Sequence, residues 1–140
     1  MISVRKQEVV KLEDVLHLYQ AVGWTNYTHQ PQMLEQALSH SLAIYMALDG
    51  DAVVGLVRLV GDGFSSVFVQ DLIVLPSYQR QGIGGALMKE ALGDFKDAYQ
   101  VQLVTDQTEK TLGFYRSLGF ETLSTFDCTG MIWLDRKKFK

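Results

Sequence analysis

The spacing of apolar residues changes along this chain, and each spacing predicts a different kind of element. Apolar residues recur every three or four positions over 11–22, which predicts a helix, and the same spacing begins again after Pro31. From residue 43 onward the apolar residues come in short runs separated by glycine-containing turns, a pattern typical of an antiparallel meander. The strands predicted in this way cover residues 2–6, 43–48, 52–60 and 66–75.

The second half of the chain predicts a strand–helix–strand unit. A wide apolar stripe over 82–96 predicts a helix, and the strand predicted at 101–105 should lie parallel to the preceding one because a helix connects them. Residues 106–109 have the spacing of a capping box, so a further helix is expected to begin there and to end at Gly119. Two last strands are expected over 120–126 and 131–134.

These elements predict one α+β domain over residues 1–140, with a mostly antiparallel sheet, one parallel β–α–β crossover and flanking helices. The apolar fraction of 47% excludes wholesale disorder, and the net charge of −3 argues against nucleic-acid binding. We expect no membrane partner, because no apolar run approaches the length of a membrane helix. The lone Cys128 fits a reducing cytoplasm, and the histidines His17, His29 and His40 have no metal-binding spacing, so no metal site is expected.

A glycine-rich segment at 80–85 joins a predicted strand to the start of a helix. Glycines leave backbone amides unscreened, and a helix N-terminus adds partial positive charge, so this segment can form a nest for a phosphate or pyrophosphate. A tight turn that lets the helix pack on its sheet is the alternative that the glycines leave open. Two common nucleotide motifs are excluded, because Ala86 and Leu87 stand where an NTPase loop needs Lys and Ser or Thr, and Leu87 replaces the third glycine of a dinucleotide fingerprint.

Two motifs resemble those of a known enzyme superfamily. The segment QRQGIG at 79–84, after LIVLP at 72–76, resembles the acetyl-CoA motif of the GNAT superfamily of N-acetyltransferases. The segment FYRSLGFE at 114–121 resembles the second hallmark of that superfamily, and the order of elements matches over nearly the whole chain. The segments VGW at 22–24 and GMIW at 130–133 resemble the bacterial and plastid branch that includes plant serotonin N-acetyltransferase-like proteins.

The resemblance implies a GNAT acyl-CoA N-acyltransferase fold with acetyl-CoA as cosubstrate. Pantetheine would bind backbone along a strand that splays from its neighbour, with the Ile73 amide polarising the acetyl carbonyl, and the pyrophosphate would lie on the loop amides. Thr108 stands where the superfamily often has Asn, which puts a side-chain amide contact to pantetheine in doubt. The implied cofactor-binding residues are Leu72, Ile73, Val74, Arg80, Gln81, Gly82, Ile83, Gly84, Gly85, Thr108 and Phe114.

The resemblance also implies roles for a phenol and a carboxylate. The matching tyrosine of the superfamily protonates the departing CoA thiolate, so Tyr115 is the predicted acid, and the pKa values of a thiol (~8.5) and a phenol (~10) are close enough for this transfer. A lysine-like amine must lose a proton before it attacks, and Asp71, just before the pantetheine strand, is the predicted catalytic carboxylate and a substrate contact. The alternatives are a core aromatic for Tyr115 and an ion-paired strand residue for Asp71.

Trp24 and Tyr27 lie between the first two predicted helices, where the superfamily usually forms a wall of the acceptor pocket. They are the predicted substrate-binding residues, with capping of the core as the alternative. The expected activity is direct transfer of acetyl, in a ternary complex, to a primary amine of small amphipathic or aromatic character or to a peptide amine. A homodimer is common in the superfamily, and the resemblance leaves the oligomeric state of this chain open. A CoA-binding sensor or partner-binding module without catalysis, and a transferase of longer acyl chains, are the alternatives.

Overall fold

The computed structural model of the protein describes residues 1–135 and 137. Two compact units follow each other along the chain, Met1–Leu103 and Val104–Lys140. The first unit consists of a sheet with helices on both faces. The described part of the second contains one α-helix and one 3₁₀ turn.

The sheet of the first unit has five strands in their sequence order, β1-β2-β3-β4-β5. The pairs β1–β2, β2–β3 and β3–β4 are antiparallel, and the pair β4–β5 is parallel, with a helix in the connection between its strands. The predicted meander and parallel crossover, and with them the predicted α+β class, are therefore confirmed. The strands are β1 (Ile2–Gln7), β2 (Ala43–Asp49), β3 (Ala52–Gly61), β4 (Ser66–Val74) and β5 (Gln100–Leu103).

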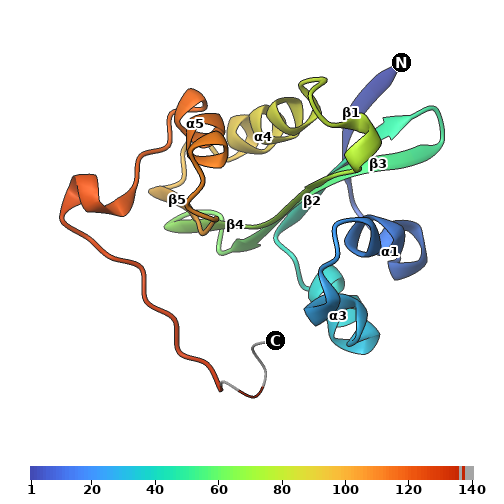
Figure 1. Ribbon diagram of the computed structural model, residues 1–140, viewed down its shortest axis with the longest axis horizontal. Coiled ribbons are helices and arrows are strands. Elements are labelled where there is room, and N and C mark those ends of the chain that lie inside the picture. Colours follow the sequence, from blue (N-terminus) through green and yellow to red (C-terminus); the bar gives the residue numbers. More distant parts are fainter. Residues whose placement is uncertain (136, 138–140) are drawn as a thin grey trace. The chain divides into compact units, whose positions relative to one another are not determined.

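Helices cover both faces of this sheet. In Figure 1, α1 and α3 lie on one face and α4 on the other. The segment between the first two predicted helices contains the single helical turn α2, in which the Thr28 amide donates to Trp24 and the His29 amide donates to Thr25. The helices are α1 (Leu12–Ala21), α2 (Thr25–Thr28), α3 (Pro31–Ser39) and α4 (Ile83–Asp94), with a 3₁₀ turn at Pro76–Tyr78.

The core on the α1 and α3 face comes from the apolar stripes of those helices and from alternate residues of the central strands. Residues three or four apart on a helix share one face, which is why the stripes predicted from the sequence point into this core. Met33 lies at the edge of the α3 stripe and is 40% exposed. The core consists of Val15, Leu18, Tyr19, Leu34, Leu38, Ile44, Met46, Leu56 and Ile73.

A β-bulge at Gln70 changes which face the side chains of β4 point to. Leu59 of β3 lies opposite Val69 and Arg58 lies opposite Asp71, so Gln70 has no partner on β3. Because successive strand residues alternate between faces, one extra residue reverses the alternation. The bulge therefore places Asp71 on the same face as Arg58, the face that α1 and α3 cover.

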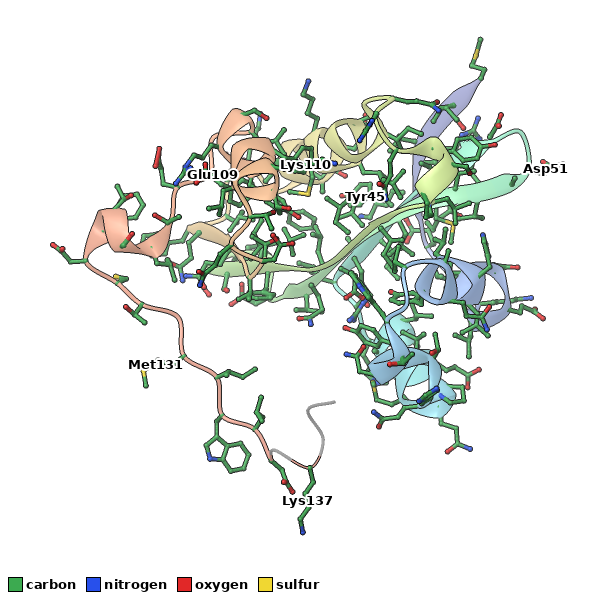
Figure 2. All side chains as sticks on the ribbon, in the orientation of Figure 1. Tyr45, Asp51, Glu109, Lys110, Met131 and Lys137 are labelled. Carbon is green, nitrogen blue, oxygen red and sulfur yellow. The ribbon has the colours of Figure 1, made fainter. Side chains whose placement is uncertain are left out.

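The opposite face packs against α4 through a glycine. A Cβ at Gly55 would lie 3.0 Å from the Ile73 carbonyl oxygen and 3.2 Å from Leu87 of α4, so the close approach of this helix depends on the missing side chain. Tyr45, which Figure 2 labels, lies on this face. Its hydroxyl donates to Asp94 of α4 at 2.6 Å. This bond fixes the last turn of α4 on the sheet.

In the second unit, α5 (Glu109–Ser117) begins one residue after Thr108. The predicted capping box is wrong, because the N-cap is Thr108, whose hydroxyl oxygen accepts from the Thr111 amide at 3.3 Å. Asp106 instead closes a turn by accepting from the Thr108 amide at 3.0 Å. The predicted end of the helix at Gly119 is confirmed by that residue's φ of +98°.

The two strands predicted after this helix are wrong. Leu123–Phe126 forms a 3₁₀ turn, and Phe120, Leu123 and Phe126 recur every three residues, which is the period of a 3₁₀ helix and not of a strand. Residues 131–134 pair with no strand in the described part of the chain. Met131, which Figure 2 labels, is 95% exposed, and Trp133 is 98% exposed. Without a neighbouring strand, an apolar run gains no ladder bonds.

Candidate active site

One edge of β4 is open where β5 ends. The parallel register of β5 runs from Ser66↔Gln100 to Val69↔Leu103, and no strand of the described chain pairs with this edge of β4 beyond Val69. The open edge begins at the bulged residue Gln70 and continues to Val74. The backbone of this stretch can therefore bind an extended ligand as an added strand would.

The hydrogen bonds of β3 show which backbone groups lie on the open edge. The Leu75 amide donates to Val54 of β3, and the Ile73 carbonyl points toward Gly55 of β3. In an extended strand the N–H and C=O of one residue share an edge and the next residue uses the other. The expectation that the Ile73 amide faces the cofactor does not agree with this geometry.

Leu72 and Val74 therefore present their backbone groups to the open edge. The Val74 carbonyl accepts a bond from the Gln79 side-chain amide at 3.1 Å, which is consistent with this direction. That bond also ties the start of the glycine-rich loop to the end of β4. The Ile73 side chain is buried in the core, so its role is in packing.

The loop after β4 holds a row of unpaired amides. After the turn at Pro76–Tyr78 the chain passes through Arg80 with φ of +67° and Gly82 with φ of +79°, and α4 begins at Ile83. In the described structure none of the backbone amides of residues 80–85 donates to a backbone or side-chain acceptor. Left-handed residues next to a helix N-terminus are the arrangement that forms an anion-binding nest.

Space above this nest is open at two of its glycines. No atom lies within 4 Å of the position that a Cβ would take at Gly82 or at Gly85. Twelve residues of α4 follow, so the helix is long enough for its dipole to favour an anion at this end. The predicted loop residues Arg80, Gln81, Gly82, Ile83, Gly84 and Gly85 thus lie together beside the open edge of β4.

A buried polar cluster lies at the other end of the open edge. The carboxylate of Asp71 accepts from Arg58 Nε at 2.7 Å, from the Tyr19 hydroxyl at 2.8 Å and from the Tyr27 hydroxyl at 2.9 Å. Asp71 is 2% exposed, and Arg58 is 4% exposed. With three donors on its two oxygens, this carboxylate is held in an ion pair and has no direct path to solvent.

Burial and the Asp71 charge raise the pKa of Tyr19 and Tyr27 above the usual value of a phenol. Burial lowers the pKa of Arg58, but the attraction and hydrogen bond of Asp71 outweigh it, so the net shift is upward. Both phenols therefore stay protonated and Arg58 stays charged at neutral pH. Each phenol hydrogen is committed to Asp71.

Aromatic side chains extend this cluster toward the surface. Trp24 packs on Tyr19 with ring centroids 6.1 Å apart, and Tyr27 packs on Tyr19 at 5.1 Å. Trp24 and Tyr27 are both partly buried and pack against the core. Part of each ring therefore caps the core, which is the alternative to substrate binding that the sequence left open. The two predicted substrate-binding aromatics are thus neighbours, with centroids 6.2 Å apart.

The remaining predicted residues belong to the second unit. Tyr115 packs between Phe114, at 4.9 Å, and Phe120, at 5.8 Å. Burial, with the charge of Asp106 as a second cause, raises the pKa of Tyr115. Thr108 donates its hydroxyl hydrogen to Asp106 at 2.6 Å, so this donor is already occupied within the second unit.

Sequence reasoning missed three residues of the polar cluster: Arg58, Tyr19 and Gln70. Arg58 interrupts the apolar run of its strand, which is the one signal that could have indicated a buried ion pair. Tyr19 fits the helical stripe and carries no signal beyond packing. Gln70 becomes notable only through the bulge, which depends on the pairing of β3 with β4.

The fold and this site match a known enzyme family. A family model described as "Acetyltransferase (GNAT) domain" matches residues 40–122. The chain therefore belongs to the GNAT family of N-acetyltransferases, as its motifs predicted.

Two curated relatives agree with the family. GCN5-related N-acetyltransferase 1, chloroplastic, of Arabidopsis thaliana is 27% identical over 97% of this chain and 68% of its own length. Serotonin N-acetyltransferase 2, chloroplastic, of Oryza sativa subsp. japonica is 30% identical over 65% of this chain. The matched region spans about half (48%) of the rice protein.

Solved structures share the fold. A GNAT-family acetyltransferase from Streptococcus pneumoniae TIGR4 superposes with a TM-score of 0.90 and 80% identity, covering 97% of this chain and 99% of that one. A GNAT-family acetyltransferase from Elizabethkingia anophelis with acetyl-CoA bound has a TM-score of 0.64 at 20% identity, covering 86% and 76%. The second likeness supports the fold alone.

The described residues lack a cluster of metal ligands and a helix that could span a membrane. No three His, Cys, Asp or Glu side chains converge there in the way that a metal ion needs. No helix in that part of the chain has the length and hydropathy to cross a membrane.

Proposed function

We propose that the protein transfers the acetyl group of acetyl-CoA directly to a primary amine within a ternary complex. The observation that carries this proposal is the row of unpaired amides at residues 80–85, which continues from the open edge of β4. Membership of the GNAT family supports the same cosubstrate.

The chain offers two sets of backbone groups that fit acetyl-CoA. The amides of residues 80–85 would hold the pyrophosphate, and the outward groups of Leu72 and Val74 would bind the pantetheine arm. Because the pyrophosphate end lies at the C-terminal end of β4, the arm runs from Val74 toward Leu72. The Leu72 amide is therefore our choice for the donor to the acetyl carbonyl, in place of Ile73. Phe114 remains a predicted neighbour of the arm.

Acetyl-CoA supplies the acetyl group as a thioester. The lone pair of the amine attacks the carbonyl carbon, a C–N bond forms, and the C–S bond breaks. Tyr115 would give its hydroxyl proton to the departing thiolate, and the proton that the amine loses restores the phenol through water. The raised pKa of Tyr115 keeps the phenol protonated until the thiolate forms, and it also widens the gap to the pKa of the thiol.

An amine with an aromatic or amphipathic body fits the wall formed by Trp24 and Tyr27. The rice relative, by its name, acts on serotonin, which is an amine of this kind. Asp71 belongs to this site, but its two oxygens are occupied by three donors, so we assign it to positioning and not to direct deprotonation. A peptide amine and a cytoplasmic location stay predictions.

The proposal is tested by release of free CoA thiol over a panel of primary amines, with acetyl-CoA affinity measured by calorimetry. Gly84→Glu is expected to weaken acetyl-CoA binding at least 100-fold, because it places a like charge at the nest. Gly93→Glu is the matched control: it makes the same change at the far end of α4, where no atom lies within 4 Å of a Cβ. Equal affinity in both variants would contradict the loop assignment.

Thiol release separates the enzyme from its alternative. Amine-dependent release by the wild type supports the transferase. Tight binding of acetyl-CoA without release for any amine would instead favour a CoA-binding sensor or partner-binding module.

A further inference from the structure

We propose that Tyr27 and the bulged residue Gln70 form the subsite for the nitrogen of the acceptor amine, and that the Arg58–Asp71 ion pair positions it. This inference rests on the proposed acetyl transfer. It assigns roles to Gln70 and Arg58, and it gives Tyr27 a polar contact in addition to its ring.

The bulge leaves Gln70 free of strand pairing, so its side chain can bind a ligand. Gln70 has no partner on β3, it lies beyond the last residue of β4 that pairs with β5, and its side chain is exposed. Its side-chain amide nitrogen lies 3.5 Å from the Tyr27 hydroxyl oxygen. The two side chains therefore meet where the buried cluster reaches solvent.

The phenol of Tyr27 is set up to accept a hydrogen bond. Its hydrogen is given to Asp71 at 2.9 Å, which leaves the oxygen lone pairs facing away from the carboxylate. Arg58 Nη2 approaches this oxygen at 3.3 Å, a long contact, and Gln70 approaches it at 3.5 Å. A phenol oxygen accepts two hydrogen bonds, so an amine N–H would take the place of the longer of these contacts, the one from Gln70. The carbonyl oxygen of Gln70 can accept a second N–H of the same nitrogen.

The subsite lies at the expected end of the pantetheine arm. The nest is at the C-terminal end of β4, so the arm passes Val74 and Leu72 before it reaches Gln70. A strand advances about 3.3 Å per residue, so the Leu72 amide and Gln70 are about 7 Å apart along β4. This distance leaves room for a thioester carbonyl that accepts from the Leu72 amide and for an amine nitrogen that is held at Gln70 beside that carbonyl.

The Arg58–Asp71 ion pair sets the position of the Tyr27 hydroxyl without adding an unpaired charge to the subsite. Arg58 and Asp71 neutralise each other, and together they make direct contacts to Tyr27: a bond from the phenol to Asp71 Oδ1 and a contact from Arg58 Nη2. Tyr19 donates to the other oxygen, Asp71 Oδ2, and is fully buried. Tyr19 and Tyr27 thus share one carboxylate, but only Tyr27 reaches the surface.

This difference supplies a matched pair of variants, assayed with acetyl-CoA and tryptamine. Tyr27→Phe and Gln70→Ala are expected to raise the KM for tryptamine at least 10-fold, with the KM for acetyl-CoA changed less than twofold. Tyr19→Phe removes a bond to the same carboxylate and is expected to lower the urea midpoint while the KM for tryptamine changes less than threefold. The same kinetic profile in Tyr27→Phe and Tyr19→Phe, or an unchanged KM in Gln70→Ala, would overturn the subsite.

The positioning role of Arg58 has its own test. Arg58→Lys keeps the charge but loses the nitrogen that reaches Tyr27, so it is expected to raise the KM for tryptamine. Added to Tyr27→Phe, it is expected to raise that KM no further, because both changes act through one oxygen. A multiplicative effect in the double variant would assign Arg58 to structure alone.

A binding measurement separates this inference from the proposed reaction. In ¹⁵N-labelled protein saturated with CoA, tryptamine is expected to shift the Gln70 side-chain amide and the Trp24 indole signals, and Tyr27→Phe is expected to remove the Gln70 shift. If thiol release fails but these shifts occur, the proposed reaction fails and the subsite stands. If the Gln70 signal does not move, the subsite is wrong even when CoA binds.

Discussion

Removing one partner of the Arg58–Asp71 ion pair is expected to destabilise the protein more than removing both. The two side chains are almost fully buried and form an N–O contact of 2.7 Å. Unit charges about 4 Å apart attract by about 4 kcal/mol at an effective dielectric constant of about 20. A charge left alone in such a site costs about 3–5 kcal/mol, whereas an apolar pair of similar volume is close to neutral.

A double-mutant cycle measures this coupling. Arg58→Met and Asp71→Leu are each expected to lower the free energy of unfolding by about 3–5 kcal/mol. The double variant is expected to lose less than either single variant, because no charge is left unpaired. Urea unfolding followed by tryptophan fluorescence gives all four values, with an unchanged m-value as the check on two-state behaviour.

Tyr45→Phe provides the control for this cycle. Tyr45 bonds to Asp94 on the α4 face and shares no partner with Asp71. Combined with Asp71→Leu, it is expected to be additive within about 0.5 kcal/mol. If Arg58→Met and Asp71→Leu are additive as well, the two charges do not stabilise each other and the account of the cluster is refuted.

Three further outcomes are expected. Tyr115→Phe should lower kcat while the KM for acetyl-CoA stays within twofold, and equal effects on both constants would remove Tyr115 as the acid. Gly55→Ala should cost about 1–3 kcal/mol in urea unfolding, because its Cβ would lie 3.0 Å from a backbone oxygen, whereas Gly93→Ala should cost nothing. The contribution of Tyr19 and Tyr27 to stability should be constant below about pH 10 and should fall above it, since burial and Asp71 raise the pKa of both and the unfolded chain loses these protons first. Tyr19→Phe should make that alkaline fall in the urea midpoint shallower, and an unchanged fall would contradict the assigned environment.

The elements that carry the cofactor chemistry could be predicted from local sequence. The strands and turns between residues 43 and 75 follow from apolar runs and glycine turns, and the nest at residues 80–85 follows from glycines at a helix start. These signals are local, because backbone direction and amide exposure depend on residues close in the chain. Which amides of β4 face away from β3 depends on the hydrogen-bonding register of the two strands. The pattern of apolar residues does not give this register, so it could not distinguish Ile73 from Leu72.

The polar cluster could not be predicted because it depends on strand register. One bulged residue, Gln70, reverses the alternation of β4 and brings Asp71 opposite Arg58. Without the bulge, Asp71 would point to the α4 face. The segment 120–126 failed for a different reason, since its apolar residues have a period of three and were taken for a strand.

The central claim is that coenzyme A binds the amides of residues 80–85 and the outward backbone of β4. The most direct test is a titration of ¹⁵N-labelled protein with CoA, followed by amide chemical shifts. The account predicts large shifts at residues 80–85 and at Leu72 and Val74, with a smaller shift at Ile73, whose amide faces β3. Saturable binding that leaves the amides of residues 80–85 unmoved would contradict it.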